Sequence, residues 1–361
     1  MRVMSDAPGK LILLGEYAVL EGAPALVGAV ARRARVTIDP AVDRSVLHSS
    51  MLSAEVSFRV VKGSMVLDET VSEADRNRLG VFKACFDRTL QSLPDGLPGP
   101  LRIGLDTSAF FLPDGSRKLG VGSSAALTVA LTASLYAWAG VMDARVPDRK
   151  RLMNEAMGAH RMAQSNTGSG VDIAASVYGG VFRYELPASD PLSDIRMMPT
   201  HLPSDLTTVA IWTGRSASTP EMVANVNRFK QRNERQYRTL MDHMTALSRA
   251  GIAALGESDT SAFLDAIRGY RDAMTELGDA SGTPIMSDPH REIDAICTGH
   301  GVCYKPSGAG GGDLGVLFAT NGAPVGEILA RLEQAGYPAF DLQIWTHGVR
   351  TTIEQLTQIQ S

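Results

Sequence analysis

Apolar positions along the chain recur in two patterns, one typical of strands and one typical of helices. Short apolar or alternating runs predict β-strands at residues 11–14, 36–38, 56–61, 101–105 and 314–319. Helical spacing of apolar residues predicts helices over residues 73–92, 148–164, 220–256, 259–280 and 324–335. Residues 124–138 are apolar on every side, so we expect a helix there that is buried all round.

The length of the chain exceeds what one hydrophobic core usually supports. With 361 residues, two domains are the natural expectation. Between residues 186 and 206 the composition shifts toward Pro, Ser and Asp, as in many connections between domains. We therefore expect an N-terminal domain over residues 1–190 and a C-terminal domain over residues 191–361.

Composition and charge argue against several classes of protein. Hydrophobic residues make up 44% and charged residues 20% of the chain, as in an ordinary soluble protein. The net charge of −4 argues against a nucleic-acid-binding surface. The sequence has no signal-peptide core and no apolar run of membrane-spanning length, so we expect a cytoplasmic protein without membrane contact. Cys85, Cys297 and Cys303 are too few and too scattered to predict a disulfide framework.

Residues 118–126, Lys-Leu-Gly-Val-Gly-Ser-Ser-Ala-Ala, combine a glycine turn with the start of the predicted buried helix. Glycines let the backbone approach a ligand closely, and a helix start offers free N–H groups and a partial positive charge to an anion. The hydroxyls of Ser123 and Ser124 can cap the helix or meet a phosphate or Mg²⁺. The lysine that follows the second glycine of a P-loop is absent. Taken alone, the segment is equally well explained by a serine-capped turn before a core helix.

Two further segments carry candidate chemistry. Lys10, in Ala-Pro-Gly-Lys, directly precedes an apolar strand, so its ammonium group is expected at the strand edge, facing a cleft. A solvated lysine is the ordinary alternative. Residues 305–315, Lys-Pro-Ser-Gly-Ala-Gly-Gly-Gly-Asp-Leu-Gly, contain five glycines and predict a loop that approaches a ligand closely, with a purely structural turn as the alternative.

In this order along the chain, the three segments resemble the motifs of the GHMP kinase superfamily, which is named for galacto-, homoserine, mevalonate and phosphomevalonate kinases. The resemblance covers essentially the whole chain. It implies a two-domain α/β (α+β) fold, with a ribosomal-protein-S5-like N-terminal domain and a ferredoxin-like C-terminal domain. It also implies that ATP lies along the glycine turn, that a small-molecule acceptor lies between the domains, and that Mg²⁺ takes part.

The resemblance implies a role for each matching residue. Lys10, Lys118 and Asp172 are expected to be catalytic, with Asp172 on the acceptor side and paired with Lys10. The residues expected to bind the nucleotide are Gly120, Gly122, Ser123, Ser124 and Ala125, and the two serines are also the expected metal ligands. The residues expected to bind the acceptor are Tyr17, Ser169, Gly170, Lys305, Ser307, Gly308, Ala309 and Gly310. His160 and Asp313 are assigned structural roles, and Asp172 can also cap a helix at 173–177.

Within the superfamily, the segments 117–124, 164–172 and 212–219 resemble the phosphomevalonate kinase branch, with departures at Ser165 and Arg215. The resemblance therefore implies phosphoryl transfer from ATP to 5-phosphomevalonate, giving 5-diphosphomevalonate and ADP in isoprenoid synthesis. A mevalonate kinase or another small-alcohol or sugar kinase is the first alternative. A catalytically silent sensor of ATP and metabolite on the same fold is the second. The expected assembly is a monomer or a homodimer.

A phosphorylated acceptor would need several cations nearby. Two dianions about 5 Å apart repel each other by roughly 13 kcal/mol at an effective dielectric constant of about 20. Besides Lys10 and Lys118, the basic residues close to the motifs are Arg161, Arg183, Arg215 and Lys305. For these four residues an ordinary surface charge explains the sequence as well as a ligand contact does.

Overall fold

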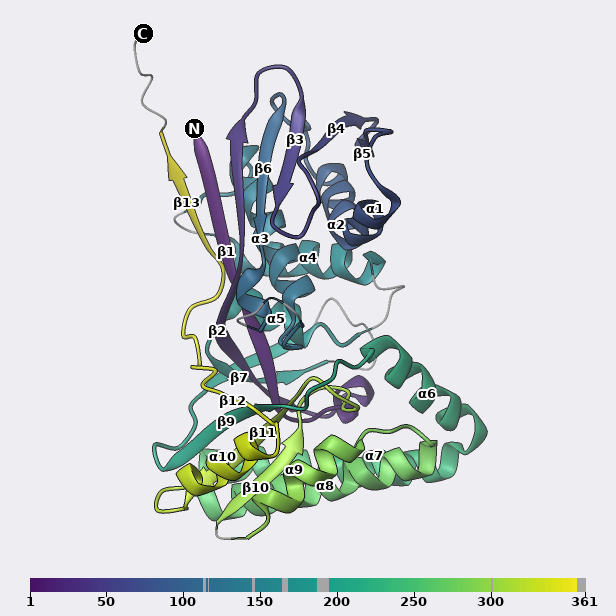
Figure 1. Cartoon of the computed structure of the whole chain (residues 1–361), viewed down its shortest axis with the longest axis vertical. Helices are drawn as coiled ribbons and strands as arrows, with labels where there is room; N and C mark the ends of the chain where they lie inside the picture. Colours follow the sequence, from purple (N-terminus) through teal and green to yellow (C-terminus); the bar gives the residue numbers. More distant parts are fainter. Residues whose placement is uncertain are drawn as a thin grey trace.

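The computed structural model describes residues 1–112, 115, 117–144, 147–163, 168–186, 195–299 and 301–355, and these residues form two sheets with helices packed against each (Figure 1). The strands are β1 (Arg2–Leu14), β2 (Ala25–Pro40), β3 (Ser45–Ser49), β4 (Val56–Val61), β5 (Ser64–Leu67), β6 (Leu101–Asp106), β7 (Val181–Glu185), β8 (Arg196–Thr200), β9 (Leu206–Trp212), β10 (Val302–Pro306), β11 (Leu314–Thr320), β12 (Ala339–Phe340) and β13 (Arg350–Glu354). The helices are α1 (Glu73–Arg78), α2 (Gly80–Gln91), α3 (Ser123–Trp138), α4 (Arg149–Ala163), α5 (Val171–Tyr178), α6 (Thr219–Arg232), α7 (Glu234–Gly256), α8 (Thr260–Ser281), α9 (Asp288–Cys297) and α10 (Val325–Gln334), with the 3-10 turns η1 (Ala18–Glu21) and η2 (Ser108–Phe110).

The larger sheet contains the long strands β1 and β2. Its main path runs β13–β1–β2–β6–β3–β4–β5, and β7 pairs with both β2 and β8. The pairing of β1 with β2 shifts register between Pro8 and Gly9, which marks a bulge. A bulge bends a strand and re-aims the side chains that follow it. In Figure 1, β1 and β2 run on past β6 and β3 toward the smaller sheet, where β7 pairs with β2, so the residues after the bulge lie where the two sheets meet.

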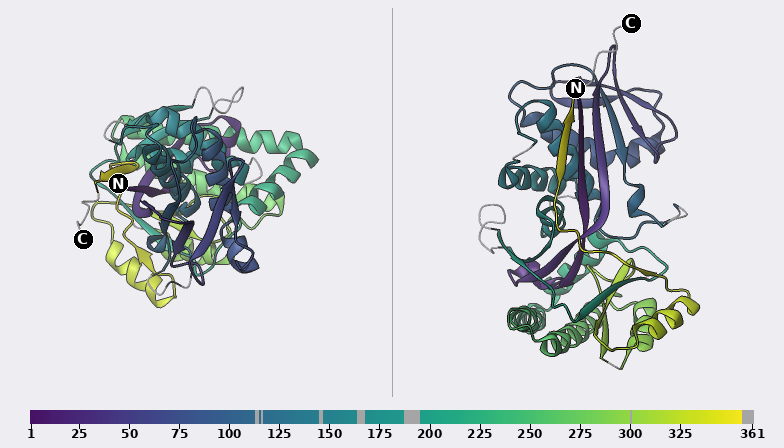
Figure 2. Two further views of the ribbon diagram at one scale, coloured as in Figure 1. Left: turned by 90° about the horizontal axis from the view of Figure 1, so that it is seen from above. Right: turned by 90° about the vertical axis from the view of Figure 1, so that its left-hand side faces the viewer.

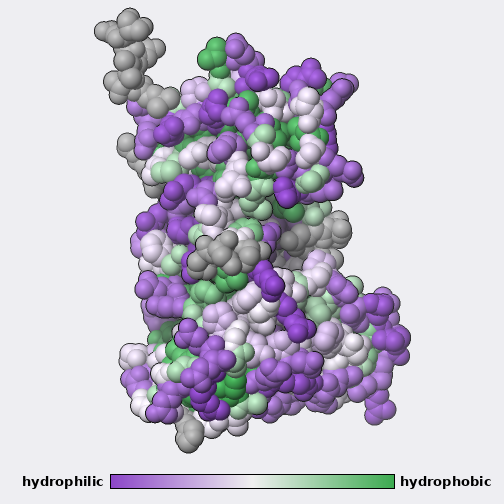
Figure 3. All heavy atoms as spheres, viewed as in Figure 1, coloured by the Kyte–Doolittle hydropathy of each residue, from purple (hydrophilic) through white to green (hydrophobic). Residues whose placement is uncertain are grey.

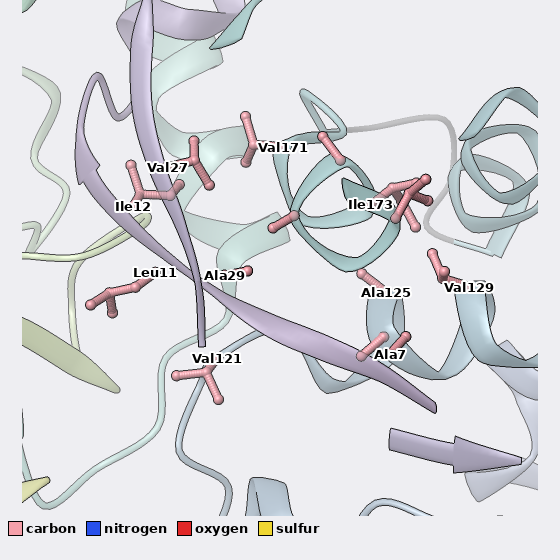
Figure 4. Close-up of a cluster of buried hydrophobic side chains, with 14 of the residues drawn as sticks. Ala7, Leu11, Ile12, Val27, Ala29, Val121, Ala125, Val129, Val171 and Ile173 are labelled. Carbon is pink, nitrogen blue, oxygen red and sulfur yellow. The ribbon is translucent and has the colours of Figure 1, made fainter. Parts of the chain in front are cut away.

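Helix α3 is buried along almost its whole length because small and apolar residues occupy every side of it. It packs against β1 and β2, and α5 packs against the same strands. Figure 4 shows side chains of β1, β2, α3 and α5 meeting in one apolar cluster. Dense packing of this kind is hard to compress, so it holds the start of α3 at a fixed position relative to β1.

The smaller sheet is antiparallel, with strand order β10–β11–β9–β12. Helix α8 packs against β10 and β11, α9 packs against β10, and α7 lies against α8. This arrangement agrees with the ferredoxin-like expectation for the second half of the chain. The connection from β10 to β11, residues 307–313, is the third glycine-rich segment, and it points toward β1.

Most predicted elements occur, but the helix predicted over 73–92 is divided into α1 and α2, and several strands, among them β8 to β10, were not predicted. Strand β4 and helix α3 confirm the predictions at 56–61 and 124–138, whereas the strand predicted at 11–14 is only the end of β1. The single helix predicted over 220–256 is wrong, because the chain breaks at Asn233. Asn233 ends α6 and caps α7 by accepting the N–H of Gln236. Helix α9, which begins with a proline in its first turn, was not predicted.

The two sheets are not formed by two consecutive halves of the chain. The boundary expected at residue 190 falls within residues 187–194, outside the described residues. Beyond it, β8 pairs with β7 and β13 pairs with β1, so both strands belong to the larger sheet (Figure 2). Residues 196–200 and 350–354 therefore complete the first sheet, and the division into 1–190 and 191–361 stays a prediction.

The surface and the helices fit the compositional expectations. The face of the molecule in Figure 3 is mainly hydrophilic, with smaller apolar areas between the polar ones. Among the described residues, none of the helices combines the length and the apolar character that crossing a membrane requires. Cys85, Cys297 and Cys303 are free and buried.

Candidate active site

A cleft of about 270 Å³ lies where β1, the start of α3 and the β10–β11 loop come together. The ends of α4 and the starts of α5 and α6 form its remaining walls. The charged or hydroxyl-bearing residues that line it are Lys10, Glu16, Tyr17, Ser123, Ser124, His160, Arg161, Ser169, Asp172, Thr219 and Asp313. Residues from all three sequence motifs are thus gathered around one space.

The glycine turn and the start of α3 form one wall. Gly120 and Gly122 have φ values of +75° and +83°, in the left-handed region that favours glycine. Helix α3 begins at Ser123, and the first N–H groups of a helix have no partner within it. Because Ser123 and Ser124 line the cleft, this helix start presents an anion site to it. Ala125 is fully buried and does not line the cleft, so only its backbone could contact a nucleotide.

Lys10 lies within β1 and spans the cleft. Its N–H donates to the carbonyl oxygen of Val121 over 2.8 Å, and a Cβ on Gly9 would lie only 2.5 Å from that same oxygen. The strand is therefore held tightly against the glycine turn. A Cβ on Gly122 would lie 3.1 Å from Cγ of Lys10, and one on Gly308 would lie 3.5 Å from its Nζ. The ammonium group thus lies between the second and third motifs. Lys10 itself stands within β1 and not at the edge of the strand, where it was predicted.

Asp172 lies in the first turn of α5. The capping residue of that helix is Gly170, and the helix begins at Val171. The capping role suggested for Asp172 is therefore wrong, because the helix starts before it. Oδ1 of Asp172 instead accepts the N–H of the next residue over 2.9 Å. Lys10 and Asp172 both approach Gly122, but no ion pair within 4.0 Å joins these two described side chains.

His160 connects Asp172 to the start of α3 beside the glycine turn, although only a structural role was predicted for it. Its Nε2 lies 3.1 Å from Oγ of Ser124, and its Nδ1 lies 4.0 Å from Oδ2 of Asp172. The imidazole is 4% exposed, so it is held in place by its surroundings and lines the cleft. The three side chains form a polar row from the start of α3 to the start of α5.

The predicted acceptor-binding residues divide into two groups. Tyr17, Ser169, Gly170, Gly308 and Ala309 line the cleft, and the hydroxyl of Tyr17 donates to the carbonyl oxygen of Ala309 over 2.5 Å. This bond joins the first motif to the third. The structure therefore brings these five predicted residues together.

Ser307 and Gly310 lie behind the cleft and do not line it. The hydroxyl of Ser307 accepts the N–H of Ile12 and donates to its carbonyl oxygen. A Cβ on Gly310 would lie 2.5 Å from the carbonyl oxygen of Ile285. Both residues fix the loop against its neighbours, and the acceptor-binding role expected for them stays a prediction.

Lys305 is fully buried and does not line the cleft, and the ligand-binding role expected for it stays a prediction. Its ammonium group donates to Oε1 of Glu16 and to the carbonyl oxygen of Pro306. Burial lowers the pKa of Lys305, and Glu16 opposes that shift. Glu16 is 2% exposed, and its Oε2 is buried without a hydrogen-bond partner. The pair joins the segment after β1 to strand β10 beneath the cleft floor.

A second, smaller pocket of about 120 Å³ adjoins the start of α3 on its other side. Ser123 and Ser124 line both pockets, and Lys118 lines only the second. Its other walls are mostly apolar, from Met51, Leu52, Leu79, Val81, Phe82, Leu105 and Leu127. Lys118 is exposed, with Nζ 5.8 Å from the centre of the Phe111 ring. Lys118 therefore lies beside the glycine turn, in the pocket next to the one that Lys10 lines.

Asp313 closes over the glycine turn, so it does more than fix its own loop. A Cβ on Gly120 would lie 2.4 Å from Cβ of Asp313, a contact that only glycine permits. Burial raises the pKa of Asp313 to about 6, while Lys10 and Lys118 act to lower it. Both lysines therefore lie within electrostatic reach of this carboxylate. Asp313 has a φ of 54°, a conformation that Asp and Asn tolerate better than most residues.

Replacing Asp313 by asparagine should stabilise the protein above pH 6. Because the folded-state pKa of about 6 lies above the ordinary aspartate pKa of 3.8, ionisation of Asp313 opposes folding. Its contribution is favourable below about pH 4 and is lost as the pH rises through 6. Urea unfolding should show a gain of ~1–3 kcal/mol for Asp313→Asn at pH 7.5 and little difference near pH 4. The exposed Asp43→Asn serves as control, and a gain that does not depend on pH would contradict the explanation.

The residues present fit a magnesium ion only in part. Among the described residues, no group of three or more His, Cys, Asp or Glu could hold a metal ion by itself. Mg²⁺ often needs only one or two protein oxygens, because substrate phosphates and water complete its shell. The hydroxyl of Ser123 and the carboxylate of Asp172 line the cleft and are suitable donors, whereas Oγ of Ser124 already contacts His160. The donor set is therefore compatible with a Mg²⁺ brought in by a nucleotide.

The site defines a phosphotransferase, and comparison with known proteins agrees. Residues 82–180 match the model of the GHMP kinases N terminal domain. The phosphomevalonate kinase of Streptomyces sp. (strain CL190) is 30% identical, over 92% of this chain and 95% of the relative. The mevalonate kinase of Arabidopsis thaliana is 24% identical, over 97% and 99% of the two chains. The Streptococcus pneumoniae phosphomevalonate kinase in complex with phosphomevalonate and AMPPNP has the same fold, with a TM-score of 0.74, 17% identity and coverage of 94% and 98%.

The chain belongs to the GHMP kinase family of ATP-dependent kinases. The resemblance identified from its three motifs is thereby confirmed, as is the two-domain mixed α/β fold. Sequence reasoning missed Glu16 and left His160 and Asp313 outside the site. The one available signal for Glu16 was its charge within an otherwise apolar segment, since a buried carboxylate requires a partner.

Proposed function

We propose that this kinase transfers the γ-phosphoryl group of ATP to 5-phosphomevalonate, giving 5-diphosphomevalonate and ADP in the mevalonate pathway. The observation that carries the proposal is the meeting of the α3 start, Lys10 and the Gly308–Ala309 backbone around one cleft. Support for this acceptor comes from the Streptomyces phosphomevalonate kinase, which is similar over nearly its whole length.

ATP would bind across the two pockets. Its phosphates would lie at the start of α3, where free N–H groups favour an anion. The base would enter the second pocket, because that pocket is largely apolar and shares Ser123 and Ser124 with the cleft. Lys118, at the border of this pocket, would lie near the phosphates. Mg²⁺, held through Ser123 or Asp172 and the nucleotide phosphates, would neutralise part of the phosphate charge.

Catalysis would rest on positioning and charge rather than on covalent chemistry. Lys10 would approach the transferred group from the opposite side to Lys118 and stabilise its charge as the bond to ADP breaks. A phosphate acceptor needs little help in losing its proton, because its second pKa is about 6. Asp172 would then orient His160, and with it Ser124, rather than remove a proton.

Mevalonate phosphorylation is the second candidate, and one observation favours it. Asp172 lines the cleft, and its Oδ2 accepts no hydrogen bond from another described residue. A carboxylate in that position could act as general base toward an alcohol. Mevalonate kinases are also among the relatives that align over most of the chain.

An ADP-release assay with each acceptor separates the candidates. Purified protein would be given MgATP with 5-phosphomevalonate, with (R)-mevalonate, or with neither, and the products identified by mass spectrometry. We expect rapid ADP release and a diphosphate product only with 5-phosphomevalonate. Turnover of free mevalonate alone would overturn the proposal in favour of mevalonate kinase. Tight ATP binding without ADP release in any mixture would favour a catalytically silent sensor.

A further inference from the structure

The last turn of α4 forms one wall of the cleft through Met157, His160 and Arg161. These positions are three and four residues apart, so they share one face of the helix. His160 contacts Ser124 at the phosphate turn. Arg161, its immediate neighbour, therefore lies close to the place where the transferred phosphoryl group would sit.

Arg161 lines the cleft, and no ion pair joins it to another of the described residues. Its Nε is buried and has no hydrogen-bond partner, and no described carboxylate lies within 4.0 Å of its guanidinium. A guanidinium group that is partly withdrawn from water and left unpaired is unusual, because buried charges are normally paired. Because Arg161 lines the cleft, its guanidinium group can donate to a ligand there.

The surroundings of Arg161 place its charge near Asp172, on the side of the cleft where the acceptor is expected to bind. Burial and Asp172 raise the pKa of the Tyr184 hydroxyl, and Arg161 opposes them, because both charges lie near that hydroxyl. The same hydroxyl donates to the carbonyl oxygen of Ser169 over 2.6 Å. Ser169 lines the cleft, as do Arg161 and Asp172, and it lies between these two residues in the sequence.

The other basic residues near the motifs form ion pairs or lie outside the cleft. Lys305 is buried against Glu16, and Arg183 forms an ion pair with Glu185 on β7. Arg215 is exposed and does not line the cleft. Lys10 is the other cationic side chain among the described lining residues, and it reaches toward Gly308 from β1.

We propose that Arg161 binds the phosphate group of the acceptor and selects phosphorylated acceptors over free alcohols. The assignment rests on the proposed function. A guanidinium group offers parallel N–H donors that match two oxygens of one phosphate, which a lysine cannot do. With Lys10 on the opposite side, Arg161 reduces the repulsion between the acceptor phosphate and the phosphates of ATP.

The test compares Arg161→Met and Arg161→Lys with the wild type and with Arg149→Met, an exposed position at the other end of α4. We expect Arg161→Met to lower kcat/KM for 5-phosphomevalonate by roughly 10- to 150-fold, the range for a hydrogen bond to a charged group. The Lys variant should recover part of this loss. The KM for ATP, the thermal midpoint and all parameters of Arg149→Met should stay unchanged.

Calorimetric binding of each acceptor without ATP identifies the group that Arg161 holds. Arg161→Met should weaken 5-phosphomevalonate binding and leave mevalonate binding unchanged. Equal weakening of both acceptors would overturn the assignment, because it would mean that Arg161 binds the carboxylate that they share. If the wild type uses 5-phosphomevalonate and Arg161→Met retains its kcat/KM within about threefold, the assignment is wrong while the proposed function stands. If the wild type uses only free mevalonate, both are wrong.

Discussion

Replacing Lys10 by methionine is expected to lower kcat by roughly 10²- to 10³-fold while the protein folds normally. The ammonium group lies between the glycine turn and Gly308, where charge must be stabilised as the phosphoryl group moves. The loss of one such group from a preorganised site has a large effect on the transition state. Methionine keeps most of the length of the side chain, and the backbone bond from residue 10 to Val121 stays in place.

Steady-state kinetics with saturating acceptor, together with thermal unfolding, checks this expectation. Lys150→Met is a suitable control, since Lys150 is exposed on α4 and far from the cleft lining. The Lys10 side chain has no described ion pair to lose, so its replacement should leave the unfolding midpoint nearly unchanged. A kcat within about threefold of the wild type would remove Lys10 from the catalytic machinery.

Replacing Lys305 by methionine is expected to destabilise the fold by about 3–5 kcal/mol. The substitution leaves the carboxylate of Glu16 buried and without its cation. An unpaired buried charge costs far more than the loss of a surface ion pair. Urea unfolding at pH 7.5 measures the change, with Lys230→Met as the partly exposed comparison because Lys230 also pairs with a glutamate, Glu21.

The double variant Lys305→Met, Glu16→Gln separates the charge effect from the packing effect. Removing both charges leaves no uncompensated ion, so the double variant should recover much of the stability lost in Lys305→Met. If it is as unstable as the single variant, the loss comes from the packing of the lysine stem, and the ion pair is not the cause.

The sequence was most informative where the signal is local. The glycine spacing at 120–122, followed by serines and a continuous apolar run, predicted both the turn and α3 because each depends on neighbouring residues only. Asn233 was missed because a single polar residue hardly disturbs the helical spacing on either side of it, although it caps α7. Local patterns therefore predicted the elements better than their boundaries.

Residue type alone could not distinguish the basic side chains that face the cleft from those that are paired inside the protein. Lys305 and Arg161 both stand near motifs, and either was suitable for binding an anion. The ammonium group of Lys305 is buried in an ion pair with Glu16, which lies 289 positions away in the sequence. Arg161 faces the cleft because α4 lies against α3. Burial and pairing of this kind follow from long-range packing, which no single segment of the sequence encodes.

During synthesis, β1 emerges from the ribosome long before β13, since Ser5 meets Thr351 across a separation of 346 positions. Until then the outer edge of β1 exposes unpaired N–H and C=O groups, a surface prone to wrong pairing. Contacts of such long range close slowly and leave partly folded chains exposed to aggregation. The wall formed by the β10–β11 loop is also made late. We therefore expect the cleft to assemble late in synthesis, only after residues 302–320 have emerged and folded.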